Sequence, residues 1–297
     1  MSIILQQTVT ACPLCGSANR SLFDQRILHG YQLVNRLCQS CGLVYLSPRM
    51  SEEQLNLFYA KKYRDLYHQS KEPTQIDLSV QAQRATHLVD LALRQGLSTV
   101  KAHLDIGCST GTLLNTFKTH YNNRTVGVEL DEVHRAYAQS HGINAYPSLV
   151  DLPGELEKAF DLVSLIHVLE HLPDPVGTLV ELRNRWMSPE GWLVLEVPNL
   201  YCHDSFEVAH LTSFSPATLT QAVRRAGFQI VHFFKHGQPR SIVLPLYLTL
   251  LARPMANPAN SPYTTEPEMG VHLKRQVGLA YRKLLTRLIP GQAWKAG

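Results

Sequence analysis

The stretch 104–111, with the sequence Leu-Asp-Ile-Gly-Cys-Ser-Thr-Gly, constrains the fold more than any other part of this chain. Apolar residues lead into an acid, small residues and glycines follow, and then Leu113, Leu114 and Phe117 recur at helical spacing. This order predicts a strand, a tight turn and a helix. A helix amino end without bulky side chains lets a ligand approach its backbone N–H groups closely. The stretch is therefore the first candidate for a binding site.

The same strand and helix alternation continues through residues 99–236. Strands are expected at 101–106, 124–129, 143–146, 160–166, 191–197 and 228–235, and helices at 112–120, 132–140, 175–186 and 216–226. Asp174-Pro175 and Ser215-Pro216 each combine a helix-capping residue with proline at the first helical position. Alternating units of this kind predict an α/β fold. We expect a doubly wound, Rossmann-like, mostly parallel seven-stranded sheet with helices on both faces.

Two C-x2-C-G motifs near the amino end predict a metal site. Cys12 and Cys15 form one pair, and Cys38 and Cys41 form the other. Four thiolates in two such turns complete a closed tetrahedral shell, which suits structural Zn²⁺. Two unrelated reduced pairs or a redox motif are the alternatives. The residues between the pairs resemble a β-hairpin, so residues 1–45 are predicted to be a small zinc-ribbon-like module.

Two further segments flank the α/β region. Residues 46–98 are predicted to be a helical connector, opened by a capping box at 51–54. Its stripe of Tyr59, Tyr63 and Tyr67 either faces the core or forms a lid that brings a tyrosine to the site. Residues 237–297 form a C-terminal extension with a basic amphipathic helix at 271–289. That helix either packs with one solvated face or makes a peripheral membrane contact.

Composition narrows the class of protein. The chain is 44% hydrophobic and 18% charged, which is normal for a globular protein. A net charge of +4 without a basic and aromatic stripe makes nucleic acid an unlikely partner. The amino end lacks the pattern of a signal peptide, and no run of 18 apolar residues occurs. A cytoplasmic location is expected.

The turn at 107–111 is compatible with three kinds of site. Its residues match the pattern G-x-S-x-G, the nucleophile elbow that would make Ser109 a hydrolase nucleophile. The spacing departs from the G-x-G-x-x-G of dinucleotide sites. S-adenosylmethionine fits better, because Asp105 at the end of one strand can reach an ammonium group. Glu129 at the end of the next strand can accept hydrogen bonds from both ribose hydroxyls.

Several motifs together resemble the class I S-adenosylmethionine-dependent methyltransferases. They are 105–111, Gly127-Val128-Glu129, Phe160-Asp161-Leu162-Val163, the segment 168–175, and Leu211-Thr212-Ser213-Phe214-Ser215 before a helix. The cysteine pairs followed by 41–49 are similar to a subgroup with a zinc-bearing head, which includes sugar C-methyltransferases. The resemblance implies a cofactor site made of Asp105, Gly107, Ser109, Gly111, Glu129, Leu130, Ser148, Leu149 and His167. Within it, Ser148 and Leu149 would lie beside adenine and His167 would border the cofactor.

The acceptor is less well defined. Sugar C-methyltransferases carry a His-Glu-His run where this chain has Val208-Ala209-His210, so only the last histidine is kept. His210 and His167 are the candidate catalytic bases, because histidine titrates nearest neutral pH. The expected activity is methylation of a small molecule, such as an activated sugar or another metabolite or glycan precursor. A zinc-headed RNA base methyltransferase and a non-catalytic assembly protein are the alternatives, and the oligomeric state is left open.

Overall fold

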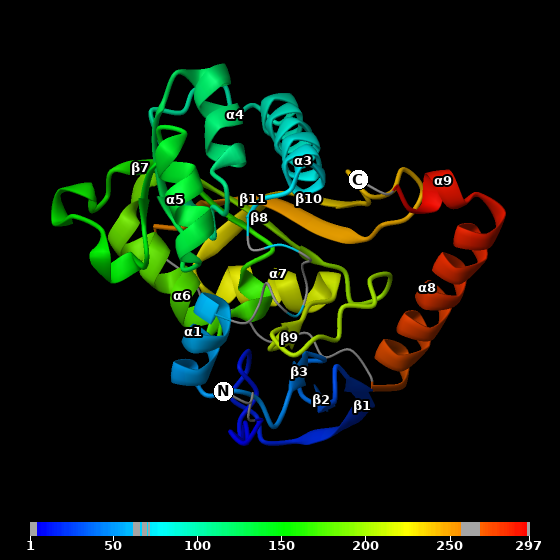
Figure 1. Cartoon of the computed structure of the whole chain (residues 1–297). Coiled ribbons are helices and arrows are strands. Elements are labelled where there is room, and N and C mark those ends of the chain that lie inside the picture. The colour runs from blue at the N-terminus through cyan, green and yellow to red at the C-terminus, as the bar shows by residue number, and fades with distance from the viewer. Residues whose placement is uncertain (1–4, 62–65, 67–69, 71, 257–267, 296–297) are drawn as a thin grey trace.

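The computed structural model describes residues 5–61, 66, 70, 72–256 and 268–295 (Figure 1). The described residues form two β-sheets. A large sheet crosses the middle of the molecule between two layers of helices, and a small sheet lies beneath it. Tyr63 and Tyr67 of the predicted tyrosine stripe lie outside the described residues. Within those residues, no helix combines the length and the hydropathy that a membrane span requires.

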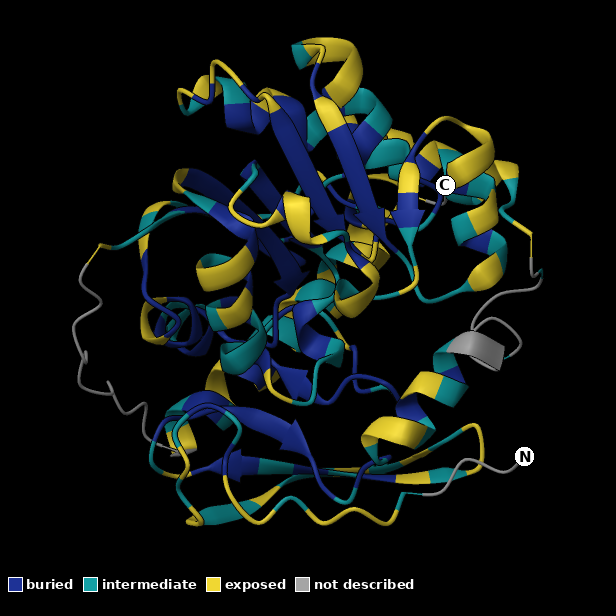
Figure 2. Cartoon of the chain, turned by 90° about the vertical axis from the view of Figure 1, so that its left-hand side faces the viewer, coloured by how far each residue is buried: buried dark blue, intermediate teal, exposed yellow. Residues whose placement is uncertain are grey.

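The large sheet has seven strands, as the sequence predicts. Their order is β10 (Phe228–His236), β11 (Tyr247–Pro254), β8 (Met187–Pro198), β7 (Phe160–Ile166), β4 (Ala102–Ile106), β5 (Arg124–Val128) and β6 (Asn144–Tyr146). The neighbours from β8 to β6 pair in parallel, whereas β11 runs antiparallel to both β8 and β10. The central strand β4 is buried along its whole length, and strands in the interior of the molecule are coloured as buried in Figure 2. The doubly wound, mostly parallel fold is confirmed.

Helices cover both faces of this sheet (Figure 1). One layer holds α3 (Gln75–Arg94), α4 (Thr112–Tyr121) and α5 (Glu132–Ser140), and the other holds α6 (Pro175–Glu181) and α7 (Pro216–Arg225). Single helical turns connect strands at η1 (Leu149–Asp151), η2 (Gly154–Leu156) and η3 (Leu169–His171). Asp174 and Ser215 cap α6 and α7 as predicted, each accepting from a backbone N–H of its own first turn.

The small sheet joins the amino end to a distant part of the chain. It contains β1 (Arg20–Leu28), β2 (Tyr31–Cys38), β3 (Val44–Leu46) and β9 (Thr212–Ser213), all antiparallel. The hairpin expected between the cysteine pairs is β1 and β2. Just before β9, the Leu211 carbonyl accepts from the Leu46 N–H at 3.0 Å, and the Leu211 N–H donates to the Glu170 carbonyl at 2.8 Å. The cysteine module is thus hydrogen-bonded to the segment that follows β8, and Leu211 of that segment is hydrogen-bonded in turn to the segment that follows β7.

The connector and the C-terminal segment complete the fold. Helix α1 (Glu52–Lys61) begins with the predicted capping box, in which Ser51 and Gln54 exchange hydrogen bonds of 3.1 and 3.3 Å. The C-terminal segment contains α8 (Glu268–Leu288) and α9 (Pro290–Ala293). Helix α8 runs along one side of the molecule, from the small sheet toward the end of β10 and β11 (Figure 1).

Three elements differ from the sequence prediction. The helix expected at 175–186 changes at residue 182 into a five-residue π-turn, η4 (Leu182–Trp186). Strand β8 starts at Met187, four residues earlier than expected. The sequence did not place the seventh strand, β11, which lies in the C-terminal extension. Pro245 interrupts the apolar run there, and the strand begins only at Tyr247.

Candidate functional site

A cavity of about 770 Å³ opens at the carboxyl ends of β4, β5 and β7. Ligands bind at this edge in doubly wound sheets. Its walls come from 105–109, 128–131, 147–150 and 166–168, and from α1 and α3 on the opposite side. Most of the residues predicted for the cofactor line it. These are Asp105, Gly107, Ser109, Glu129, Leu130, Ser148, Leu149 and His167.

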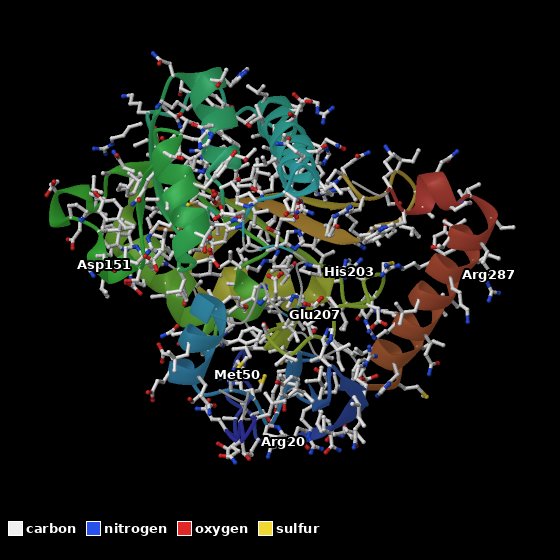
Figure 3. All side chains as sticks on the ribbon, viewed as in Figure 1. Arg20, Met50, Asp151, His203, Glu207 and Arg287 are labelled. Carbon is white, nitrogen blue, oxygen red and sulfur yellow. The ribbon has the colours of Figure 1, made fainter. Side chains whose placement is uncertain are left out.

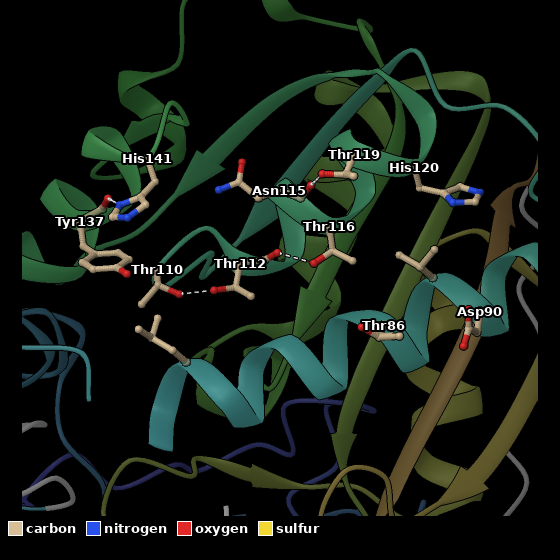
Figure 4. Close-up of a pocket in the computed structure, with 12 residues that line it drawn as sticks. Thr86, Asp90, Thr110, Thr112, Asn115, Thr116, Thr119, His120, Tyr137 and His141 are labelled. Atoms are coloured by element: carbon tan, nitrogen blue, oxygen red, sulfur yellow. Dashed lines mark hydrogen bonds between the residues drawn. The ribbon is translucent and has the colours of Figure 1, made fainter. Parts of the chain in front are cut away.

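A second cavity, of about 540 Å³, lies between α3, α4 and α5 (Figure 4). Threonines and an asparagine line it, and several of these already form hydrogen bonds within α4, such as Thr116 Oγ1 to the Thr112 carbonyl. It is away from the strand ends, and Asp105 and Glu129 do not line it. The larger cavity is therefore the candidate site.

The turn after β4 has an unusual backbone. Gly107, Ser109 and Gly111 have φ angles of 71°, 49° and 74°, in the left-handed region. A Cβ on Gly107 would lie 2.4 Å from Val168 Cγ2, and one on Gly111 would lie 2.8 Å from Ile143 Cγ1. Both positions therefore require glycine. Gly111 is not part of the cavity lining, and its contact with Ile143 gives it a packing role at the start of α4.

Glu129 ties this turn to the neighbouring strand. Its Oε2 accepts from the Ser109 N–H and its Oε1 from the Asp131 N–H, both at 2.8 Å. Each carboxylate oxygen can accept more than one hydrogen bond. The side chain therefore has a fixed position on the cavity wall, from which it can bind two adjacent hydroxyl groups.

Asp105 is buried beside the turn. Its Oδ1 accepts a 2.5 Å hydrogen bond from Ser164 Oγ, which also lies 2.7 Å from His103 Nε2. Burial raises the pKa of Asp105 to about 7, against the opposing effect of the Ser164 hydrogen bond. Near neutral pH the carboxyl group is therefore close to its titration midpoint. A cation in the cavity would favour its ionised form.

His167 lies between two buried carboxylates. Its Nε2 is 3.1 Å from Glu196 Oε1, and its Nδ1 is 3.5 Å from Glu170 Oε1. Burial and the Arg84 charge oppose protonation, but the hydrogen bonds to Glu170 and Glu196 raise the pKa of His167 overall. An imidazolium has no lone pair to accept a proton. The geometry therefore favours His167 as a charged hydrogen-bond donor over a general base.

The other predicted base, His210, does not line the cavity. Its Nδ1 lies 2.6 Å from the Ser205 carbonyl, and its ring packs at 4.6 Å against the ring of His171. His171 does line the cavity, and burial lowers its pKa to about 4. Its Nδ1 lies 2.6 Å from the hydroxyl of Tyr59, another lining residue, and 3.0 Å from the Ala209 carbonyl. His210 thus reaches the cavity only through His171.

The sequence indicates Tyr59 only as one member of a stripe that could form a lid over the site, and it does not single out Arg84. Arg84 comes from α3, and its Nε lies 3.1 Å from Glu196 Oε1. His171 is a weaker candidate base on the sequence because it follows β7, and the Glu170-His171 pair is expected mainly to fix the loop before α6. The partner of Arg84, Glu196, is distant in the chain, so no local pattern could have indicated Arg84.

Two clusters of the described residues have the donor groups of a metal site. The ligand atoms of Cys12, Cys15, Cys38 and Cys41 all lie within 4.8 Å of one another. Their Sγ atoms are 3.6 Å apart between Cys12 and Cys41 and 3.5 Å apart between Cys15 and Cys38. Four sulfurs bound to one zinc ion lie roughly 3.8 Å apart, so the four cysteines fit Zn²⁺. The second cluster is Glu170, His171 and His210.

The sequence and fold of this chain are similar to those of known proteins. The family described as "Methyltransferase domain" matches residues 80–233, which is just over half of the chain. The chain belongs to this family. The match begins in α3 and includes the turn after β4, Glu129, His167 and His171.

Individual relatives of this methyltransferase-family chain are distant. Malonyl-[acyl-carrier protein] O-methyltransferase of Halalkalibacterium halodurans is 28% identical over 142 residues, covering 43% of this chain and 52% of the relative. Ubiquinone biosynthesis O-methyltransferase of Chromobacterium violaceum is 28% identical over 106 residues, covering 33% and 45%. The chain thus spans about half the length of the curated relatives it matches.

A solved structure supports the fold. It is the Burkholderia thailandensis 1,6-didemethyltoxoflavin-N1-methyltransferase with bound 1,6-didemethyltoxoflavin and S-adenosylhomocysteine. The TM-score is 0.55 at 17% identity, and the match covers 78% of this chain and all of the other. At this identity the likeness establishes the shared fold.

The glycine requirement of the turn is testable with two substitutions. We expect Gly107→Ala to lower the free energy of unfolding by about 2–4 kcal/mol, because positive φ and the contact with Val168 both oppose a Cβ. Gly30→Ala is the control, since Gly30 has φ 81° but a Cβ there would meet no neighbouring side chain or backbone atom within 4 Å. It should cost about 1 kcal/mol. Urea denaturation measures both, and equal losses would contradict a tight packing requirement at Gly107.

Proposed function

We propose that this chain transfers a methyl group from S-adenosylmethionine to a small-molecule acceptor. The proposal rests mainly on one observation: Asp105 and Glu129 line the same cavity beside the glycine turn. This cavity lies at the strand ends, where doubly wound sheets bind ligands. Family membership supports the same donor. A cavity of about 770 Å³ is within the range for small-ligand sites.

The predicted cofactor residues would contact different parts of S-adenosylmethionine. Glu129 would accept hydrogen bonds from the two ribose hydroxyls, and Ser148 with Leu149 would border the adenine. Asp105 would face the ammonium group of the methionine portion, and the absence of side chains at Gly107 would let that portion approach the backbone. When bound, S-adenosylmethionine supplies a methyl group that is already activated on sulfur, so the protein mainly aligns the acceptor.

The acceptor side is proposed to be the half of the cavity bounded by α1, α3 and η3. His171 has a low pKa and is neutral at pH 7, so a ring that donates from Nδ1 to the Ala209 carbonyl keeps a lone pair on Nε2. The Tyr59–His171 pair would orient the acceptor hydroxyl and receive its proton. His210, packed against His171, would hold that ring in place. Arg84 and His167 are paired with buried carboxylates, so they would act mainly by fixing the shape of this half of the cavity.

The finer assignments are also proposals. We infer that the amino-terminal module holds one structural zinc ion in its four cysteines. The motif likeness to sugar C-methyltransferases makes an activated sugar one acceptor class. Incubation with methyl-labelled S-adenosylmethionine and cell extract, followed by mass identification of the labelled product, tests the acceptor class. Label in a small molecule supports the proposal, whereas label confined to RNA would favour the RNA alternative.

Donor binding is tested by calorimetry. We expect the wild-type protein to bind S-adenosylmethionine and Glu129→Ala to bind at least tenfold more weakly, because about two charge-assisted hydrogen bonds are lost. Glu157→Gln is the control, since Glu157 forms a surface ion pair with Arg185, at 2.8 Å, and does not line the cavity. Lack of binding by the wild-type protein, or equal binding by Glu129→Ala, would refute the proposed site.

Asp105 gives a pH prediction. Protonation below its pKa of about 7 removes the negative charge that attracts the ammonium group. We therefore expect S-adenosylmethionine affinity to rise with pH between about 5.5 and 7.5, by up to roughly tenfold per pH unit. Asp105→Asn should bind weakly with a flatter profile. Matching profiles for the two proteins would show that another group controls the pH response.

Zinc is tested by elemental analysis of the purified chain. We expect about one zinc ion per chain and a loss of thermal stability when a chelator removes it. Cys15→Ser should lose the ion, whereas Cys202→Ser should keep it, because Cys202 is a buried thiol outside the cluster. A zinc-free wild-type protein with an unchanged melting temperature would be inconsistent with a structural ion.

A further inference from the structure

Helix α8 has one side fixed against the body of the protein. Val271 and Arg275 are buried, and the Arg275 guanidinium lies 2.8 Å from Asp204 and 4.0 Å from the centre of the Phe206 ring. Gly278 packs directly on the backbone, since a Cβ there would lie 2.0 Å from the Tyr201 carbonyl oxygen. These contacts determine which face of α8 points inward.

The opposite face exposes a continuous apolar stripe. We define the α8 stripe as Met269, Leu273, Val277, Tyr281, Leu284 and Leu288. Between 47% and 81% of each residue is exposed. At 100° per residue, the six side chains fall within an arc of about 120° on the helix surface. Such an arc normally faces a core, yet no described residue covers it.

The charges around the stripe have one sign. Lys274 follows one edge of it, and Lys283 with Arg287 follow the other. Arg287 projects away from the body of the protein (Figure 3). The single acid of α8 is its first residue, Glu268, whereas residues 269–297 contain six lysines and arginines and no aspartate or glutamate. The exposed apolar arc is thus bordered by cations, without an acid in this segment to neutralise them.

We propose that α8 lies flat on an anionic lipid bilayer. The α8 stripe enters the boundary between headgroups and acyl chains, while Lys283 and Arg287 contact lipid phosphates. Tyr281, at the edge of the stripe, has the amphipathic ring that is enriched at membrane interfaces. The proposal concerns where the protein acts and does not depend on the reaction.

Charge complementarity favours a bilayer over a second copy of the chain. Two α8 stripes packed on each other would bring their bordering cations together. Residues 269–297 offer no acid to pair with them, so the bordering cations of the two copies would repel each other. An anionic surface satisfies both the apolar stripe and its cations.

Vesicle co-sedimentation of the full-length protein tests the proposal. We expect binding to vesicles of phosphatidylglycerol and phosphatidylcholine, weaker binding to phosphatidylcholine alone, and a decrease with rising salt. Val277→Glu/Leu284→Glu should reduce binding by at least about tenfold. Both side chains are exposed, so the fold should be kept, and unchanged thermal melting verifies this.

The control variant is Ile76→Glu/Val231→Glu, which adds the same charges at exposed apolar positions on α3 and β10. It should bind anionic vesicles like the wild-type protein. Absence of wild-type binding, or an equal loss in the control, would overturn the proposal. So would a wild-type dimer that Val277→Glu/Leu284→Glu converts to a monomer in analytical ultracentrifugation, because the α8 stripe would then be a self-association surface.

Discussion

The hydrogen bonds between the turn after β4 and the end of β5 are the constraint on which the candidate site depends. The N–H groups of Gly107 and Cys108 donate to the Val128 carbonyl at 2.7 and 3.0 Å, and that of Ser109 donates to Glu129. These bonds offset the strain of a serine at positive φ. Because they join two strand ends, Glu129 and the turn cannot move independently. The wall that would hold a nucleoside is therefore in place before any ligand arrives.

A buried carboxylate holds side chains of the opposite wall of the cavity in place. Glu196, on β8, has no exposed surface, and it lies 3.1 Å from Arg84 and His167 and 3.3 Å from His236. Thr249 Oγ1 donates to the same carboxylate at 2.7 Å. Burial alone would raise the pKa of Glu196, but these neighbours lower it well below the usual value. One carboxylate therefore connects α3, β10, β11 and the residue after β7, and removing it would take away a buried ion-pair partner of Arg84.

The two walls differ in how far sequence could predict them. Asp105 and Glu129 each end a parallel strand, and adjacent parallel strands end at one edge, so their proximity followed from the strand and helix pattern. Arg84 and Glu196 belong to elements whose relative positions depend on tertiary packing. His210 was expected near the substrate because it follows β8, but the carbonyl of Ser205 directs its ring behind His171. Strand β11 was not predicted, because the apolar run that contains it is interrupted by Pro245. Such a run does not indicate which sheet it joins.

The position of β9 changes how the amino-terminal module should be regarded. This two-residue strand belongs to the segment after β8, yet it pairs with β3, and Leu211 beside it is hydrogen-bonded to both Leu46 and Glu170. Glu170 lies next to His167 and His171. The module therefore supports, through Leu211 and Glu170, the wall of the cavity that contains His167 and His171. No described residue of the module itself lines the cavity, so its influence on the wall passes through Leu211 and Glu170, and exchanging the module would alter the support of the wall without changing its lining.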